Sequence, residues 1–271
     1  MTRIAGWANA ETMRLVGIAL LHFLWQGVAI AAAAFVAMSV VRRASAKYLV
    51  AVAMLAVMLA APVLTFFVLA QRHESERPMA VSANGLVAPR AGSLVAADPA
   101  SPAIGFEAAA LQKNSSIYLL WFVEAWFFGV VLLSLRPAAG FFLIERLRLK
   151  KGAMVSGALR DRCLELQRRV GLNRVVRYCE SLQLEAPAVV GWFRPVILLP
   201  VSALTGLTSL QLEAVIAHEL AHVKRLDAFV NLFQIAAETL LFYHPAVWWL
   251  SKRVRAEREN CCDDVAIAVC G

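Results

Sequence analysis

Two histidines and a glutamate in the second half of the chain have the spacing of a metal-binding catalytic helix. The segment "AVIAHELAHVKR", residues 214–225, places His218 and His222 four residues apart. On a helix such residues lie on one face, one turn apart, so both imidazoles can reach one metal ion. Glu219 follows the first histidine and can act as general base toward a water molecule. The alternative is an amphipathic helix with two solvated histidines.

A catalytic zinc ion needs a third protein ligand and an open position for water. A second apparent helix, "SKRVRAERENCCDDVAIAV", follows downstream and contains Glu259 and, one turn later, Asp263. We therefore expect one zinc ion per chain, bound by His218, His222 and Glu259. Asp263 can accept a hydrogen bond from a ligand histidine and fix its tautomer. The alternative for these two carboxylates is an ordinary charged helix face.

The five cysteines do not predict a second, structural zinc site. Cys261, Cys262 and Cys270 contain no C-x-x-C pair, and no cysteine pair elsewhere could complete such a site. The count is odd and the spacing is not that of a disulfide framework. All five lie in the half of the chain that we place in the cytoplasm, where thiols stay reduced.

The catalytic helix is expected to lie in an α+β region. Thr208 and Gln211 form a capping box that starts the helix. Upstream, "SGALRDRCLELQRRVGL" predicts an amphipathic helix that ends at Gly171. The segments "VVRYCES" and "AVVGWFRPVILLP" predict short strands, with a turn at residues 191–195.

The first half of the chain has the composition of a membrane protein. The sequence is 60% hydrophobic and only 17% charged, and apolar segments at about 15–41, 48–70 and 117–135 reach the ~20 residues that a transmembrane helix needs. We expect two transmembrane helices with a short cytoplasmic loop in 1–70 and a flexible extracytoplasmic loop in 71–116. A third transmembrane helix is expected in 117–135 and a cytoplasmic metallopeptidase domain in 136–271. The net charge of +8 comes from basic residues beside apolar runs, so we expect no direct nucleic-acid binding.

The distribution of charge predicts the orientation of these helices. Arg42, Arg43 and Lys47 lie between the first two spans, and six basic residues against one glutamate follow the third. The segment 71–115 carries balanced charge. The positive-inside rule therefore places the N-terminus outside and residues after 136 inside.

Residues 228–251 separate the expected metal ligands and look like a fourth span. A single crossing would put His218 and Glu259 on opposite faces of the membrane, and two crossings need about 20 residues each. The segment must therefore leave and return on one side, as a membrane-apposed helix at or dipping into the inner leaflet, and Pro245 offers the break. A polar stripe that lipid alone would not tolerate consists of Asn231, Gln234 and Glu238.

Four basic side chains are candidates for stabilising the oxyanion of a tetrahedral intermediate. They are His244, Arg253, Arg255 and Arg258. A turn residue is the favoured interpretation of His244.

Two ionisable residues fall at similar depth in the first and third spans. His22 and Glu124 each lie about seven residues into their helix, so we expect them to face one another. The alternative, equally favoured, is that each side chain snorkels or hydrogen-bonds to the backbone separately.

The chain resembles the BlaR/MecR-type membrane zinc metallopeptidases, the antirepressor family of gluzincins. The resemblance covers nearly the whole chain and rests on "LHFLWQG", "AVVGWFRPVILLP", "AVIAHELAHVKRLD", "FYHPAVWW" and "ERENCCDD". It implies that His218, His222 and Glu259 are the zinc ligands and that Glu219 is the catalytic glutamate. Asp263 matches the acid that follows the third ligand.

The resemblance also implies an architecture and a function. The fold class is a mainly α membrane protein, with three transmembrane helices and a cytoplasmic α+β zincin-like domain. It implies a multi-pass protein of the bacterial inner (cytoplasmic) membrane, whose partners are the lipid bilayer and a cytoplasmic protein substrate. That substrate would be a transcriptional repressor, cleaved by a zinc-dependent endopeptidase in signal transduction.

Two departures from the family pattern matter. The family usually continues into a further transmembrane helix, and its best-known members carry a penicillin-binding sensor domain. This chain ends at Gly271, so truncation at the C-terminus is one interpretation. The competing function is a non-catalytic membrane regulatory or interaction protein derived from such a peptidase, although membrane anchoring alone does not require the histidine and glutamate pattern.

Overall fold

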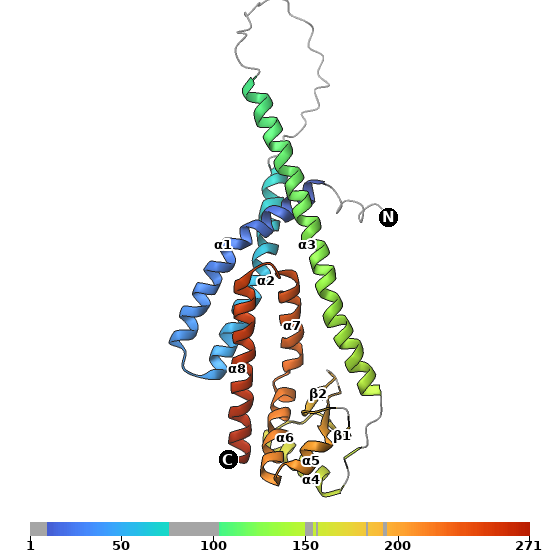
Figure 1. Ribbon diagram of the computed structural model, residues 1–271. Coiled ribbons are helices and arrows are strands. Elements are labelled where there is room, and N and C mark those ends of the chain that lie inside the picture. Colours follow the sequence, from blue (N-terminus) through green and yellow to red (C-terminus); the bar gives the residue numbers. More distant parts are fainter. Residues whose placement is uncertain (1–9, 76–102, 150–153, 156, 183, 192–193) are drawn as a thin grey trace, which may run out of the picture. The chain divides into compact units, whose positions relative to one another are not determined.

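The computed structural model describes residues 10–75, 103–149, 154–155, 157–182, 184–191 and 194–271 (Figure 1). Its fold is mainly α-helical with one small sheet, as predicted. The helices are α1 (Ala10–Val40), α2 (Ala44–Ser75), α3 (Ala103–Leu149), α4 (Gly157–Val170), α5 (Val201–Gly206), α6 (Ser209–Lys224), α7 (Asp227–Leu240) and α8 (Pro245–Cys270). The strands are β1 (Arg177–Ser181), β2 (Ala188–Val190) and β3 (Val196–Pro200).

Helices α1, α2 and α3 contain the three membrane spans expected from the sequence. Segments Glu11–Val40, Ala44–Ser75 and Ile117–Leu143 are long and apolar enough to cross a bilayer. Helix α2 continues to Ser75 and α3 begins at Ala103, so helix enters the predicted loop 71–116 from both sides. In the second of these segments the alanine run at 108–110 favours helix, although the segment is too polar to be a span. The rest of that predicted loop, 76–102, lies outside the described residues.

The chain divides into two compact units, and residues 1–24 and 60–128 form the first. Here Gly17 of α1 faces α3, because a Cβ at Gly17 would lie 3.2 Å from side-chain atoms of both Leu119 and Val123. His22 lies five residues further, rotated by about 140° around the helix, and its Nδ1 donates to the carbonyl of Ile18 at 3.0 Å. Glu124 is exposed. The expected pairing of His22 with Glu124 is therefore wrong, and the alternative, a separate hydrogen bond to the backbone, holds for His22.

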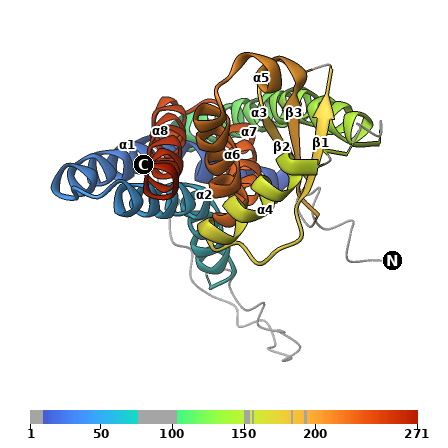
Figure 2. The same ribbon diagram turned by 90° about the horizontal axis from the view of Figure 1, so that it is seen from below.

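Residues 25–59 and 129–271 form the second unit, which contains the sheet. The strand order is β1-β3-β2, with β1 parallel and β2 antiparallel to β3. Helices α4 and α6 cover the sheet (Figure 2). Their shared buried core includes Leu166, Val170, Tyr178, Ile197, Leu199, Ile216, Leu220 and Val223. The predicted strands and the amphipathic helix α4 are confirmed.

Helix α6 is fixed at its start and along its buried face. The Thr208 side chain accepts a hydrogen bond from the Gln211 amide, and the Gln211 side chain accepts one from the Thr208 amide, which is the predicted capping box. The buried face of α6 packs on the sheet. His218, Glu219 and His222 are only partly buried, on the remaining side of the helix.

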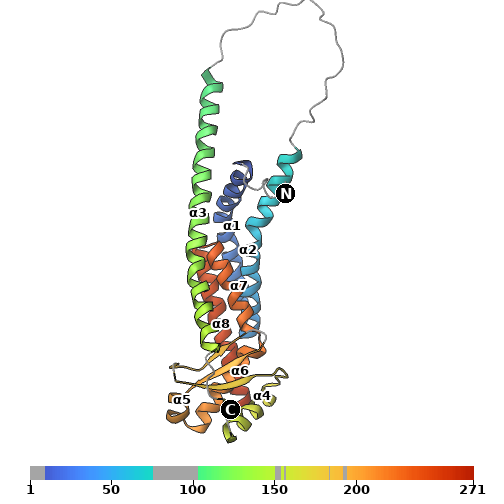
Figure 3. The ribbon, with the colours of Figure 1, turned by 90° about the vertical axis from the view of Figure 1, so that its right-hand side faces the viewer.

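Helices α7 and α8 form a hairpin, and they lie side by side in Figures 1 and 3. The chain reverses at residues 241–244, and Pro245 is the first residue of α8. The imidazole Nδ1 of His244 accepts a hydrogen bond from the Ala246 amide at 3.2 Å, which caps the new helix. The predicted break at Pro245 and the turn role of His244 are thus confirmed.

The tip of this hairpin lies against the middle of two membrane spans. A Cβ at Gly27 of α1 would lie 2.6 Å from the His244 ring, and a Cβ at Gly129 of α3 would lie 2.5 Å from the Phe242 ring. The two glycines lie 13 and 14 residues before the span ends at 40 and 143, or about 20 Å along each helix. Both ends of the hairpin therefore lie on one side of the membrane, as expected. Its tip reaches deeper than a helix lying at the membrane surface would.

The polar residues of the hairpin bond to one another. Gln234 is fully buried and donates to the carbonyl and hydroxyl oxygens of Ser251, at 2.9 and 2.8 Å. Ser251 in turn donates to Glu238, which forms an ion pair with Arg255 at 2.8 Å. Two members of the predicted polar stripe thus face α8 rather than lipid, which explains how a membrane-inserted hairpin tolerates them.

Candidate active site

The three expected metal ligands converge at the base of the α7–α8 hairpin. Nε2 of His222 lies 3.1 Å from Nε2 of His218, and Oε2 of Glu259 lies 3.4 and 3.6 Å from these two nitrogens. A tetrahedral zinc ion with bonds of about 2.0–2.1 Å separates its ligand atoms by about 3.3 Å. The three atoms therefore fit one zinc ion, with the fourth position available for a water molecule.

Each histidine turns its other ring nitrogen to a carboxylate. His218 Nδ1 lies 2.9 Å from Asp263 Oδ1, and His222 Nδ1 lies 2.8 Å from Asp227 Oδ2. Such carboxylate partners fix the orientation and tautomer of ligand histidines. The contact to Asp263 is the one expected from the sequence. Asp227 was not predicted as a histidine partner from the sequence. Its position five residues after His222 is the one sequence feature that could have indicated this role.

Asp227 connects the site to a membrane helix. The hydroxyl of Tyr48, in the first turns of α2, donates to Asp227 Oδ1 at 3.3 Å. The Arg225 guanidinium lies 4.5 Å from the centre of the Tyr48 ring. Asp227 and Tyr48 are 5% and 6% exposed, so the contact is shielded from solvent. Residues this far apart in sequence carry no local pattern that could have revealed the contact.

Arg258 fixes the second oxygen of Glu259. Its Nε lies 3.3 Å from Glu259 Oε1, and its Nη1 donates to Gln234 Oε1 at 3.4 Å. The other carboxylate oxygen, Oε2, is the one that faces the two histidines. Among the arginines considered for oxyanion stabilisation, Arg255 is paired with Glu238 and Arg253 lies over Trp249.

A second group near the site could also hold a metal, but it fits less well. It consists of His222, Asp227 and Cys262. His222 Nδ1 is already bonded to Asp227, and Cys262 Sγ lies 3.4 Å from that nitrogen. Burial, followed by the charge of Asp227, raises the pKa of the Cys262 thiol well above its usual range. A protonated thiol is a poor metal ligand, so this group is better described as support for His222.

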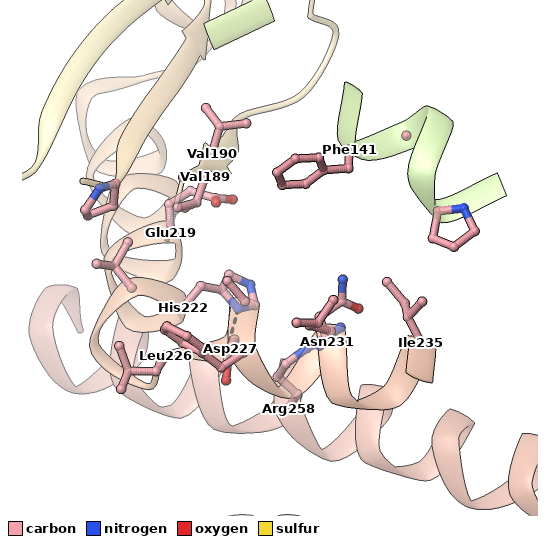
Figure 4. A pocket seen from close by; sticks show the side chains of 18 of the residues that line it. Phe141, Val189, Val190, Glu219, His222, Leu226, Asp227, Asn231, Ile235 and Arg258 are labelled. Carbon is pink, nitrogen blue, oxygen red and sulfur yellow. Dashed lines mark hydrogen bonds and ion pairs between the residues drawn. The ribbon is translucent and has the colours of Figure 1, made fainter. Parts of the chain in front are cut away.

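Glu219 borders a cavity of about 530 Å³. Figure 4 shows its carboxylate pointing into the space, with Val189 and Val190 on the same side and Phe141 and Ile235 opposite. Burial raises the pKa of the Glu219 carboxyl above its ordinary value, as does the charge of Glu259, while the histidines act in the opposite direction. The cavity is thus mostly apolar, and three acids line it at the candidate metal site: Glu219, Asp227 and Glu259.

His244 does not belong to this site. It is 2% exposed and lies at the hairpin tip, 15 residues before Glu259 on α8, or about 22 Å along the helix. Arg258, by contrast, lines the cavity beside Glu219 and Glu259. The structure therefore leaves Arg258 as the one candidate for oxyanion stabilisation that borders the cavity.

Comparison with known proteins agrees with this architecture. The family model described as BlaR1 peptidase M56 matches residues 22–270. The chain is 25% identical over 152 residues to "Regulatory protein BlaR1" of Bacillus licheniformis, covering 56% of this chain and 25% of that protein. It is 24% identical over 157 residues to "Methicillin resistance mecR1 protein" of Staphylococcus aureus, covering 56% of this chain and 26% of that protein. The aligned part thus spans about a quarter of the length of these curated relatives.

Proposed function

The chain belongs to the BlaR1 peptidase M56 family, and from that premise we propose that it is a membrane-embedded, zinc-dependent endopeptidase. The observation that carries the proposal is the set of distances between His218, His222 and Glu259, which matches the edges of one tetrahedral site. We assign one zinc ion per chain to these ligands and the base to Glu219. Asp263 and Asp227 hold the two histidines in place.

The cleavage chemistry follows from these positions. The chemistry that a bound zinc ion supplies is polarisation of the scissile carbonyl and a lower pKa for its water, toward ~7. Glu219 removes the proton from the attacking water and delivers it to the leaving amine nitrogen. Arg258, which lines the same cavity, offers positive charge to the developing oxyanion.

The sheet edge offers a place for the substrate backbone. β2 is an outer strand of the described sheet, and Val189 and Val190 of β2 line the cavity that Glu219 borders. An extended peptide added beside β2 would gain main-chain hydrogen bonds and lie along the candidate metal site. This arrangement favours an unfolded or loop segment as the substrate.

The site is proposed to act on the cytoplasmic side of the bacterial inner membrane. Basic residues at the α1–α2 connection and after the third span support that orientation, with the N-terminus outside. The proposed substrate is a cytoplasmic protein, a transcriptional repressor by family resemblance, which makes the chain part of a signalling pathway. The name of one relative, "Regulatory protein BlaR1", agrees with such a role.

A substitution of the base tests the proposal. Glu219→Gln keeps the size of the side chain and leaves all three ligands intact, so it should retain zinc but lose cleavage of an unfolded protein such as casein, by about 10²–10⁴-fold. Asp264→Asn, an exposed change one residue beyond Asp263, is the matched control and should keep both. Cleavage by Glu219→Gln at the wild-type rate would show that Glu219 is not the base.

A further inference from the structure

A small cavity, separate from the candidate active site, lies where α1 ends and α2 begins. It has a volume of about 140 Å³ and is enclosed by α1, the first turn of α2 and α8. Its apolar wall is formed by Phe35, Met38 and Trp249, and its charged rim by Lys47, Arg253 and Glu257. None of these residues takes part in the candidate active site.

The apolar wall lies at the level of a membrane–water boundary. Phe35 and Met38 belong to the last turns of the first span, which ends at residue 40, and the second span begins at residue 44. The rings of Phe35 and Trp249 are 6.5 Å apart. Tryptophan is enriched at this level of a bilayer, where an apolar surface meets lipid headgroups.

The rim of the cavity carries more positive than negative charge. Within the described part of the chain, Lys47 and Arg253 form no ion pair, and Arg253 instead lies 5.9 Å from the centre of the Trp249 ring. Glu257, the acid of the rim, accepts a hydrogen bond from Asn260 at 3.3 Å. Two cations against one carboxylate leave the cavity positively charged.

We propose that this cavity binds the phosphate of an anionic phospholipid headgroup. Lys47 and Arg253 would contact the phosphate oxygens, and the wall of Phe35 and Trp249 would contact the start of the acyl chains. Basic pockets between transmembrane helices are known to accept such headgroups. The cavity has room for a phosphate group but not for a folded partner, which favours a lipid over a protein. This site does not depend on the proposed peptidase activity.

Lipid binding to the full-length chain in detergent tests the site. Native mass spectrometry would measure the affinity for phosphatidylglycerol, phosphatidylcholine and inorganic phosphate separately. We expect phosphatidylglycerol to bind more tightly than the other two. The double variant Lys47→Gln/Arg253→Gln should weaken phosphatidylglycerol binding by about 25-fold, since each of the two basic residues contributes about fivefold near an anionic headgroup.

The loop between α1 and α2 offers a charge-matched control. Arg42 and Arg43 are exposed and do not line the cavity, so Arg42→Gln/Arg43→Gln should leave the affinity nearly unchanged. The charge-preserving pair Lys47→Arg/Arg253→Lys should retain binding, and the single variants serve if a double variant does not fold. Equal losses of phosphatidylglycerol affinity in the two glutamine double variants would indicate nonspecific electrostatic attraction rather than a binding site. Inorganic phosphate binding as tightly as phosphatidylglycerol, or equal binding of the two lipids, would overturn the lipid assignment.

Discussion

His222 directs its two ring nitrogens to different partners: Nδ1 lies 2.8 Å from Asp227 Oδ2, and Nε2 lies 3.1 Å from His218 Nε2. The hydrogen bond to Asp227 leaves Nε2 as the nitrogen available to a metal ion. His218 has the same arrangement through Asp263. Both imidazoles are therefore oriented by carboxylates before any metal binds, which reduces the reorganisation that binding requires.

Loss of the Asp227 carboxylate should weaken metal binding without removing a ligand. We expect Asp227→Asn to lower zinc affinity by about 10–100-fold, the usual effect of removing a partner of a ligand histidine. Competition with a chelator of known affinity measures the change, and circular dichroism checks the fold. Asp264→Asn should bind zinc like the wild type. Unchanged affinity in Asp227→Asn would show that the contact does not support the site.

Tyr48→Phe should have a smaller effect in the same direction. The substitution removes the hydroxyl that donates to Asp227 at 3.3 Å but keeps the ring beneath Arg225. At 3.3 Å this bond is longer than an ordinary O–H···O hydrogen bond, and His222 keeps its direct contact to Asp227. Zinc affinity should therefore fall less than in Asp227→Asn. A larger loss would mean that Tyr48 supports the site by a route other than Asp227.

The close approach of the hairpin tip predicts unequal effects of three glycine substitutions. Alanine at Gly27 or Gly129 would place a Cβ within 2.6 or 2.5 Å of the His244 or Phe242 ring. Such overpacking costs about 1–3 kcal/mol, so both variants should unfold at lower temperature in detergent. Gly140→Ala, also in α3, meets no atom within 4 Å and should be neutral or stabilising, since alanine favours helix. Equal unfolding temperatures for all three would contradict the tip contacts.

The candidate metal site was the part of the chain that could best be predicted from the sequence. The four-residue spacing of His218 and His222 belongs to one helix, and the capping box at Thr208 fixes where that helix starts. Local periodicity is sufficient for both inferences. The assignment of Glu259 in turn required the intervening segment to return to the same side of the membrane, and the hairpin geometry agrees with that requirement.

Contacts between distant segments could not be predicted in the same way. Tyr48 and Asp227 are separated by 179 residues. The local sequence around each residue gives no indication that the two are in contact. The pairing of His22 with Glu124 failed because similar depth in two helices does not fix the rotation of each about its axis. The depth of the hairpin depends on two glycines, Gly27 and Gly129. Their closeness to the hairpin tip is a tertiary contact and could not be predicted from the sequence.

The central claim is that His218, His222 and Glu259 bind one zinc ion that the chain uses for peptide cleavage. Metal analysis of the purified full chain, beside Glu259→Ala and the Asp264→Asn control, tests it most directly. We predict one zinc ion per chain in the wild type and the control, and a large loss of zinc in Glu259→Ala. A wild-type chain without zinc would favour the non-catalytic membrane protein, and full zinc occupancy in Glu259→Ala would contradict the assigned ligand set.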